Sequence, residues 1–358
     1  MVYLSAQDQR IQACQQLLNE AANQDRIHGI TLTIIAPDGT EYPMAAGVAD
    51  READKAMTPA SRMLLGSIGK MYVAASIMQL IEAGKLDLDD PLTKHLHEDW
   101  YQRVPNFDQL TVLHLLRHTS GIPRWVFDPQ IWGDLKDDPD KVWSIKDRLA
   151  YVFDADPVHA PGEDWAYSDT NYIILGAILE ELTGTSFYAY VQEHLLDPYG
   201  LDQTSPSDRR DLEGMVPGYT VMGQQLQLPE KLVENGKYAF NPQLEWCGGG
   251  FVTTSTDLAR WARQLYTGKV LSEQSTKLMM TPGEQPTELG KGVRYGFGTI
   301  VWADGRVGHT GFMPGYNSAV HYDPASGYAM AIQYNTDGPT RDYSAGVILN
   351  KCLELLQE

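Results

Sequence analysis

The chain has 358 residues, which is enough to bury a large core, and its content of 43% hydrophobic and 21% charged residues is ordinary for a globular protein. Because 28 Lys and Arg residues stand against 47 Asp and Glu residues, the formal charge is −19, and no basic cluster occurs; both facts argue against binding to nucleic acid. No stretch approaches the roughly 18 consecutive apolar residues that a membrane span requires. The three cysteines predict neither a disulfide framework nor a metal site: Cys14, Cys247 and Cys352.

The N-terminal segment predicts a helix followed by a strand hairpin. Its first residues, MVYLSAQDQRIQACQQLL, lack the basic start and apolar centre of a secretory signal, which indicates the cytoplasm, or the periplasm or the exterior if a leader has been removed. Residues 6–25 have the pattern of an amphipathic helix. Apolar residues then alternate over 29–50 around the turn PDGT at 37–40, as in a β-hairpin.

From 58 to 207 the pattern is mostly helical. The clearest helices are predicted at 145–154 (IKDRLAYVFD) and at 170–184, where Gly184 ends the segment TNYIILGAILEELTG. The acidic stretch IWGDLKDDPDKVW at 131–143 lacks the ligand spacing and the glycine of a calcium loop, so we interpret it as a solvated surface loop.

The last third of the chain returns to strands after one more helix. The segment STDLARWARQLYTG at 255–268 predicts a helix with Ser255 or Thr256 as N-cap and with Gly268 just beyond its end. Three strand-like stretches then precede a terminal helix: 295–303, 305–323 and 327–335.

Strands near both termini with helices between them predict an α+β fold, in which the two ends of the chain close an antiparallel sheet and a helical region is inserted. We expect residues 1–57 and 285–358 to form the lobe that holds this sheet. Residues 58–284 would form a mainly helical lobe, and the two lobes would make one compact unit. The sequence leaves the oligomeric state open.

A serine and a lysine lie three residues apart in the apolar run LLGSIGKMYVAAS, residues 64–76. On a helix, Ser67 and Lys70 would project from the same face, and the lysine would be a cation in an apolar setting. A serine hydroxyl is a poor nucleophile unless a base, an orienting partner and an oxyanion hole assist it. The pair therefore predicts a nucleophile with its base, and the alternative is a lysine that reaches solvent from a half-exposed helix.

A second motif, WAYSDTNY, places Tyr167 and Asp169 at the start of a predicted helix. A phenol beside an ammonium has its anion stabilised, so Tyr167 can share a proton with Lys70 and Ser67. The alternative is a capping motif with a packed tyrosine.

A third motif, VGHTGFMPGYNS, places His309, Thr310 and Gly311 on a predicted strand. These residues offer a ring nitrogen, a hydroxyl and a position that a substrate can approach closely. The N–H of Phe312, directly after them, is a candidate oxyanion donor. The alternative is a tight glycine-rich strand with a surface histidine.

In their order and types, the three motifs match the signature set of the penicillin-recognising serine enzymes: S-x-x-K, a Tyr/Ser-x-Asn element, and Lys/His-Thr-Gly. Longer blocks also occur in family order: QLIEAGKLDLDDPLTKHL, LTVLHLLRHTSGI, PGEDWAYSDTNYIILGAILEELTG, GGGFVTTSTDLARW and HTGFMPGYNS. The sequence resembles the class C β-lactamase-like family, which includes D-alanyl-D-alanine carboxypeptidases, D-aminopeptidases and family VIII-like carboxylesterases. Its His-Thr-Gly triplet is most similar to the Streptomyces-type DD-peptidase branch.

The resemblance implies a β-lactamase/transpeptidase-like fold and an acyl-serine intermediate, with no metal and no cofactor. Ser67 would be the nucleophile, and Lys70 and Tyr167 would act as general base and then protonate the leaving group. The N–H groups of Ser67 and Phe312 would form the oxyanion hole. Substrate contacts are implied for four further residues: Asp169, His309, Thr310 and Gly311.

Two departures from the family pattern bear on the substrate. The family usually has asparagine where this chain has Asp169, and an ionised carboxylate accepts hydrogen bonds but does not donate them. Carboxypeptidase members carry an arginine where this chain has Ile300, and Arg306 lies an odd number of residues from His309, on the opposite face of a regular strand. Both departures favour a neutral ester or an amine-bearing substrate.

The sequence therefore predicts a serine hydrolase, esterase-like or promiscuous, that acts on a small-molecule ester, amide or D-amino-acid peptide. The alternatives within this class are a D-alanyl-D-alanine carboxypeptidase or D-aminopeptidase and a β-lactamase. From another class, the alternative is a penicillin-binding sensor domain without turnover. His114 and His118 have the spacing of two metal ligands on a helix, but no third ligand is evident, and we expect them to serve in packing and capping.

Overall fold

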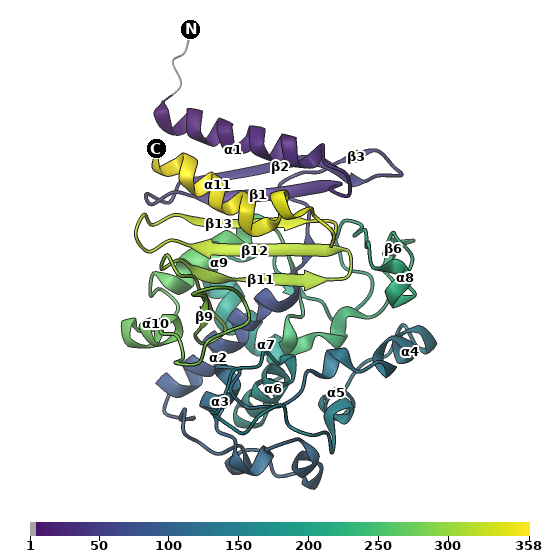
Figure 1. The fold of residues 1–358 in the computed structure, drawn as a ribbon, viewed down its shortest axis with the longest axis vertical. Helices are drawn as coiled ribbons and strands as arrows, with labels where there is room; N and C mark the ends of the chain where they lie inside the picture. Colours follow the sequence, from purple (N-terminus) through teal and green to yellow (C-terminus); the bar gives the residue numbers. More distant parts are fainter. Residues whose placement is uncertain (1–4) are drawn as a thin grey trace.

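The computed structural model describes residues 5–358 of the chain. Its main sheet has eight antiparallel strands in the order β3-β2-β1-β13-β12-β11-β10-β9, and the long strands lie above most of the helical region in Figure 1. The first three strands and the last five make up this sheet: β1 (Gly29–Ile35), β2 (Glu41–Asp50), β3 (Lys55–Ala56), β9 (Arg294–Tyr295), β10 (Ile300–Val301), β11 (Val307–Met313), β12 (Tyr316–Tyr322) and β13 (Ala329–Tyr334). The predicted antiparallel sheet, built from both ends of the chain, is confirmed.

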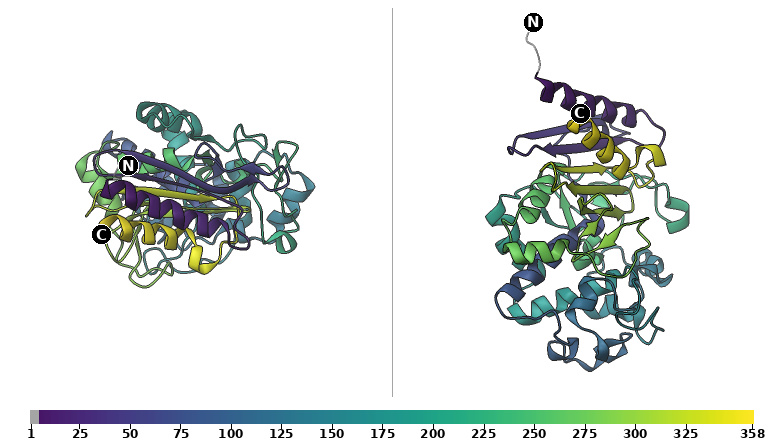
Figure 2. Two further views of the ribbon diagram at one scale, coloured as in Figure 1. Left: turned by 90° about the horizontal axis from the view of Figure 1, so that it is seen from above. Right: turned by 60° about the vertical axis from the view of Figure 1, so that its left-hand side comes forward.

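The two ends of the chain meet where β1 pairs with β13, with Ile30 opposite Tyr334. All of β1 is buried because helices cover both faces of the sheet. On one face, α1 (Ala6–Ala22) and α11 (Ala345–Gln357) lie side by side (Figure 2).

The other face of the sheet packs against α9 (Ser255–Tyr266). Because side chains alternate along a strand, Ile30 and Leu32 join the core under α1 and α11, whereas Thr33 points to α9. The Thr33 and Ser255 hydroxyls are 3.0 Å apart and share a hydrogen bond.

The middle of the chain supplies the remaining helices: α2 (Lys70–Glu82), α3 (Val112–Leu116), α4 (Gln130–Asp137), α5 (Ile145–Leu149), α6 (Asp169–Thr183), α7 (Phe187–Val191), α8 (Gly223–Leu226) and α10 (Glu273–Met280). It also contains two small sheets: β4 (Met63–Leu64), β8 (Phe251–Thr253) and β5 (Ser205–Pro206) form one, and β6 (Val233–Glu234) pairs with β7 (Lys237–Tyr238) in the other. In the centre of this region α2 packs against α6, and α3 packs against α6 as well.

The helix predicted at 170–184 is confirmed, since α6 ends at Gly184, which takes the left-handed conformation with φ 64°. The interpretation of 131–143 as a loop is wrong in its first half. There α4 forms because Ile131 and Leu135, four residues apart, bury the same face of a helical turn.

Two predicted helix boundaries also differ. The N-cap of α9 is Thr254, whose hydroxyl accepts from the Asp257 N–H at 3.2 Å, and not Ser255 or Thr256. The helix predicted at 145–154 ends as α5 at Leu149 and continues as a short 3-10 turn.

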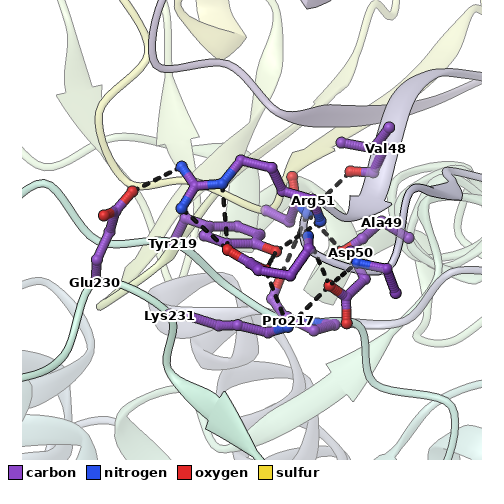
Figure 3. Close-up of polar contacts among 11 residues, drawn as sticks. Val48, Ala49, Asp50, Arg51, Pro217, Tyr219, Glu230 and Lys231 are labelled. Carbon is purple, nitrogen blue, oxygen red and sulfur yellow. Dashed lines mark hydrogen bonds and ion pairs between the residues drawn. The ribbon is translucent and has the colours of Figure 1, made fainter.

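A polar cluster fastens the segment that contains α8 to the end of β2 (Figure 3). The Arg51 N–H donates to the Tyr219 hydroxyl at 2.8 Å, and the Arg51 guanidinium donates to Glu230 at 2.8 Å. Lys231 pairs with Asp50 at 2.8 Å. Because α8 lines the candidate site described below, this cluster helps to fix one wall of that site.

Within residues 5–358, none of the helices combines the length and the apolar character that crossing a bilayer demands. The three cysteines are free thiols and all are buried.

Candidate active site

Ser67 lies in a short 3-10 helix that leads directly into α2, and Lys70 is the first residue of α2. The Lys70 side chain is fully buried, with 0% exposed. Its Nζ donates to Ser67 Oγ at 3.2 Å, to Asp169 Oδ1 at 2.6 Å and to the Gly248 carbonyl at 2.6 Å. Since an ammonium has three N–H donors, the charged form of Lys70 uses its whole hydrogen-bonding capacity here.

Asp169 is the first residue of α6 and bridges two cations. Its Oδ2 accepts from Arg124 Nε at 3.0 Å and from Arg124 Nη2 at 2.8 Å. Burial alone would raise the pKa of Asp169, but Lys70 and Arg124 hold this pKa well below its usual range. Burial alone would lower the pKa of Lys70, but Asp169 raises it above its ordinary value. The pair is therefore ionised, which leaves Lys70 without a free lone pair to accept a proton.

Tyr167 lies close to both of these cations. The Lys70 ammonium and the Arg124 guanidinium are each 5.1 Å from the centre of its ring. Its hydroxyl is buried and forms no hydrogen bond of good geometry within the described chain, although Ser67 and Lys70 are near enough to influence its titration. Burial raises the pKa of Tyr167 above its ordinary value, and the charge of Lys70 opposes this shift. The ring of His118 packs beside Tyr167 with a centroid distance of 4.2 Å.

His309 is buried on β11 and is held by two hydrogen bonds. Its Nδ1 lies 2.6 Å from the Thr310 carbonyl and its Nε2 lies 2.9 Å from the Tyr295 hydroxyl. A carbonyl only accepts, so Nδ1 carries the proton and Nε2 accepts from Tyr295. Burial, with help from the charge of Lys70, lowers the pKa of His309 to about 3, and the ring is neutral. It makes no direct hydrogen bond to Ser67 or Lys70; its ring centre is 6.3 Å from that of Tyr167.

The strand β11 runs tightly past the residues before Ser67. A Cβ added to Gly66 would fall 2.6 Å from the Phe312 nitrogen and 2.3 Å from its carbonyl oxygen. A Cβ added to Gly311 would fall 1.9 Å from the Leu65 carbonyl oxygen. The backbone of Phe312 therefore lies directly beside the residue that precedes Ser67.

Next to Ser67 is a cavity of about 380 Å³. Ser67, Asp169 and Phe312 line it, whereas Thr310 and Gly311 do not, and Thr310 is exposed on the strand. Most of the wall is apolar: Val126, Phe127, Ile131, Trp132, Phe240 and Leu244. One further acid, Glu245, also lines it.

No sequence pattern marks Arg124, Glu245 or the Gly248 carbonyl as part of this site. Arg124 lies in a loop, and only the presence of a buried acid at Asp169 could have pointed to a cationic partner. The Gly248 carbonyl contributes through the main chain, which no sequence pattern specifies.

Among residues 5–358, no three His, Cys, Asp or Glu side chains are grouped so that they could hold a metal ion. His114 Nδ1 accepts from the Thr111 N–H at 3.1 Å, and His118 Nδ1 accepts from the Ser168 N–H at 3.1 Å. Both histidines thus have capping and packing contacts.

The chain is similar in sequence to several known proteins. The chain matches the Beta-lactamase family over residues 8–351. It is 28% identical over 316 residues to the Bacillus subtilis protein PbpX, which is named as a penicillin-binding protein; the match covers 87% of this chain and 71% of PbpX. It is 31% identical over 196 residues to the esterase EstB of Burkholderia gladioli, over 52% of this chain and 48% of EstB.

Among solved structures, a D-stereospecific amidohydrolase from Streptomyces sp. superposes with a TM-score of 0.79 at 25% identity, over 95% of this chain and 97% of that one. Together with the family match, this similarity confirms the β-lactamase/transpeptidase-like fold that the sequence predicted.

Proposed function

The chain belongs to the beta-lactamase family, and on that premise we propose that it hydrolyses an ester or an amide through an acyl-serine intermediate. The observation that carries the proposal is the contact of 3.2 Å between Lys70 Nζ and Ser67 Oγ, at the edge of an apolar cavity. A hydroxyl in contact with a buried cation, with main-chain amides nearby, is suited to nucleophilic attack on a carbonyl carbon.

In the acylation step, Tyr167 acts in its phenolate form, after releasing its own proton to solvent. Ser67 Oγ forms a bond to the acyl carbon while the Ser67 proton passes to this phenolate. We assign the proton to Tyr167 because the three donors of Lys70 are already engaged and the ammonium can stabilise the phenolate. The N–H groups of Ser67 and Phe312 bind the oxyanion of the tetrahedral intermediate. Tyr167 then gives the proton to the leaving group as its bond to the acyl carbon breaks.

In the deacylation step, a water molecule attacks the acyl carbon and transfers a proton to Tyr167. The bond between Ser67 Oγ and the acyl carbon breaks, Ser67 regains a proton, and the carboxylic acid leaves. His309, as a neutral ring, takes no proton in either step and orients Tyr295 beside Tyr167.

An esterase-like or promiscuous activity is the preferred form of this proposal. The cavity is mostly apolar and suits an acyl chain, and both oxygens of Asp169 are occupied by cations, so Asp169 offers no donor to a peptide carbonyl. The similarity to EstB supports an ester substrate, and the similarity to the Streptomyces amidohydrolase supports a D-amino-acid amide as the next candidate. Action as a D-alanyl-D-alanine carboxypeptidase or as a β-lactamase ranks below these.

A second candidate is a penicillin-binding domain that is acylated and does not turn over. The observation that favours it is the ion pair between Lys70 and Asp169 at 2.6 Å, because a lysine held in its charged form is a weak base for activating water. The similarity to PbpX points in the same direction.

Replacement of Ser67 by Ala tests the proposal. Turnover of p-nitrophenyl butyrate should fall by about 10³-fold or more, because the nucleophile is lost. A fluorophosphonate should add one adduct to the wild-type protein, on Ser67, as measured by mass spectrometry. Replacement of Ser344, whose hydroxyl caps no helix N–H, serves as the matched control and should leave turnover unchanged.

Ester turnover, together with mass spectrometry of the protein after incubation with a penicillin, separates the two candidates. A stable penicillin adduct on Ser67 without ester turnover would identify the sensor domain. Turnover that persists in Ser67→Ala, or an adduct on another residue, would contradict both candidates.

A further inference from the structure

The carboxylate of Glu245 lines the cavity beside Ser67 but has no partner there. Within residues 5–358 it makes no side-chain hydrogen bond and no ion pair, although three cations lie close enough to affect its titration: Lys70, Arg124 and Arg148. Lys70 and Arg124 are both engaged with Asp169. The cavity therefore holds a carboxylate that no cation of the protein neutralises by contact.

The third cation, Arg148, fixes the backbone that carries Glu245. Arg148 is 1% exposed and donates to the Leu244 carbonyl at 2.8 Å and to the Gln243 carbonyl at 2.5 Å. Its guanidinium also lies 5.2 Å from the ring of Trp246. A buried arginine thus holds the backbone directly before Glu245 and packs over the ring of the residue after it, and its donors are committed to carbonyls.

The turn is also strained at the residue that follows Glu245. Trp246 has φ 41°, in the left-handed region that side chains other than glycine rarely adopt. Glu245 Oε2 lies 3.5 Å from where a Cβ on Gly248 would be, and the Gly248 carbonyl accepts from Lys70. The strained turn therefore presents an acid to the cavity and a carbonyl to Lys70 at the same time.

Burial raises the pKa of Glu245 to about 7, with Asp169 acting in the same direction and Lys70, Arg124 and Arg148 opposing them. A carboxylate held in apolar surroundings without a partner is costly, and a bound cation relieves that cost. A protein that keeps such a group on the wall of its candidate active site has a position suited to a positively charged ligand.

We propose that Glu245 binds an ammonium group carried by the acyl portion of the substrate. This inference rests on the proposed hydrolase function and narrows its substrate class to aminoacyl esters or amides. Tyr167 gives the leaving group its proton, so the leaving group must lie near Tyr167. Because Tyr167 does not line the cavity, we place the acyl portion of the substrate in the cavity. The ammonium would lie between Glu245 and the apolar wall.

The test compares esters that differ in charge but not in shape. β-Alanyl and butyryl p-nitrophenyl esters form one pair, and 6-aminohexanoyl and heptanoyl p-nitrophenyl esters form a second pair that reaches farther. For each pair, the measured quantity is the ratio of kcat/KM for the ammonium ester to kcat/KM for its neutral isostere. In at least one pair, Glu245→Gln should lower this ratio by about tenfold at pH 8, because Gln keeps the size of the side chain and removes its charge.

Glu234→Gln is the matched control, because it removes the same charge from an exposed strand outside this cavity. Its ratios should stay within twofold of the wild-type ratios, which excludes an effect of the overall charge. A fall of less than threefold in both pairs for Glu245→Gln, or an equal fall for Glu234→Gln, would overturn the inference.

The wild-type protein provides a second measurement that does not depend on a variant. Six titratable groups lie close enough to Glu245 to interact with it electrostatically: Asp169, Lys70, Arg124, Arg148, Tyr188 and Tyr238. Their pKa values all lie outside the range from pH 6 to 8: that of Asp169 is far lower, that of Arg148 is about 10, and the others are raised. The ratio should therefore rise between pH 6 and 8 as Glu245 ionises, and a flat ratio in both pairs would overturn the inference.

Failure of this inference is distinguishable from failure of the proposed function. Suppose that the neutral esters are hydrolysed in a Ser67-dependent way, but the kcat/KM ratios change neither in Glu245→Gln nor with pH. The hydrolase function is then supported, and the ammonium site is contradicted. If no ester is turned over and no serine is modified, the proposed function fails first.

Discussion

At Asp169 an anion occupies a position where the family usually has asparagine, and two cations surround it. Lys70 contacts one carboxylate oxygen at 2.6 Å, and Arg124 contacts the other at 2.8 Å. The acid at 169 and the arginine at 124 make sense together, because either one alone would leave an unbalanced charge in a largely buried place. The family asparagine has an amide N–H that could donate to a substrate. The Asp169 carboxylate can only accept hydrogen bonds, and both of its oxygens already accept from Lys70 and Arg124.

Replacement of Asp169 by Asn should lower the free energy of unfolding by about 3 kcal/mol, because Lys70 and Arg124 would lose their anionic partner. The double variant Asp169→Asn/Arg124→Gln should recover part of this loss, since it removes one of the two unbalanced charges. Urea unfolding followed by circular dichroism measures the three proteins.

A surface pair of the same types gives the control for this prediction. Asp208 contacts Arg209 at 2.8 Å, and their side chains are 37% and 65% exposed. Asp208→Asn should change the free energy of unfolding by less than about 0.5 kcal/mol, because water screens an exposed pair. Equal losses for the variants at 169 and 208 would show that Asp169 holds no special electrostatic position.

At the scale of elements, the site depends on how closely β11 passes the 3-10 helix that carries Ser67. Gly66 makes this passage possible, since it has φ 57° and its α-carbon faces the backbone of Phe312. Gly84, at the end of α2, has a similar φ of 68° but nothing within 4 Å of an added Cβ. The two glycines thus share a backbone conformation and differ in their surroundings.

Gly66→Ala should therefore lower kcat for p-nitrophenyl butyrate by about 100-fold, because the added methyl group pushes Ser67 away from Phe312 and misaligns the attacking oxygen. Gly84→Ala bears the same backbone strain, of about 1 kcal/mol, and should leave kcat within twofold. Steady-state kinetics, with urea unfolding to confirm that both variants fold, measures the effect. If Gly66→Ala kept its turnover within threefold, the close approach of β11 would not matter for activity.

Helices and strands that form through contacts between residues close in the sequence could be predicted here. Those that depend on contacts with distant parts of the chain could not. The β1–β2 hairpin and α6 follow from local signals, a PDGT turn and a terminal Gly184, and both are present. The first half of 131–143 is helical because Ile131 and Leu135 find a core to pack against, which the acidic composition of the stretch hides. In this segment, tertiary packing of the apolar side chains outweighs the weak local helix propensity.

The sequence patterns did not predict contacts between loops that lie far apart in the chain. Arg124 lies 45 residues from Asp169, and Gly248 lies 178 residues from Lys70. Neither contact has a periodicity or a motif that would pair the two residues. The predicted residues Ser67, Lys70, Tyr167 and Asp169 lie together in the structure, whereas their catalytic roles stay predictions.

At the scale of the whole molecule, the N-terminal and C-terminal regions of the chain pack against each other. The strand β1 pairs with β13, and α1 packs beside α11, so residues from the two ends share one core. Strand patterns near both termini predicted an antiparallel sheet with inserted helices, and the resemblance to the family implied the particular fold. Unfolding of any large part should then expose the candidate site, and global stability should respond to charges buried there.

Glu245 allows a test of this coupling through pH. Its pKa of about 7 in the folded protein is raised above the value of about 4.3 for an unfolded chain, so the folded state prefers the protonated acid. The stabilising contribution of this preference is complete below about pH 4 and is lost as the pH rises through 7. Gln resembles the protonated acid and cannot ionise. Glu245→Gln should therefore match the wild-type stability near pH 4.5 and exceed it by about 1–2 kcal/mol at pH 8.

Urea unfolding at a series of pH values measures this difference. Three buried histidines, His118, His309 and His321, also have lowered pKa values and destabilise the protein in acid. They are present in both proteins, so their contribution cancels and the difference isolates the carboxyl group. A stability gain that is the same at pH 4.5 and at pH 8 would mean that Glu245 is not an acid held against its ionisation. A protein that keeps an acid at such a cost to its stability at neutral pH has a use for its charge.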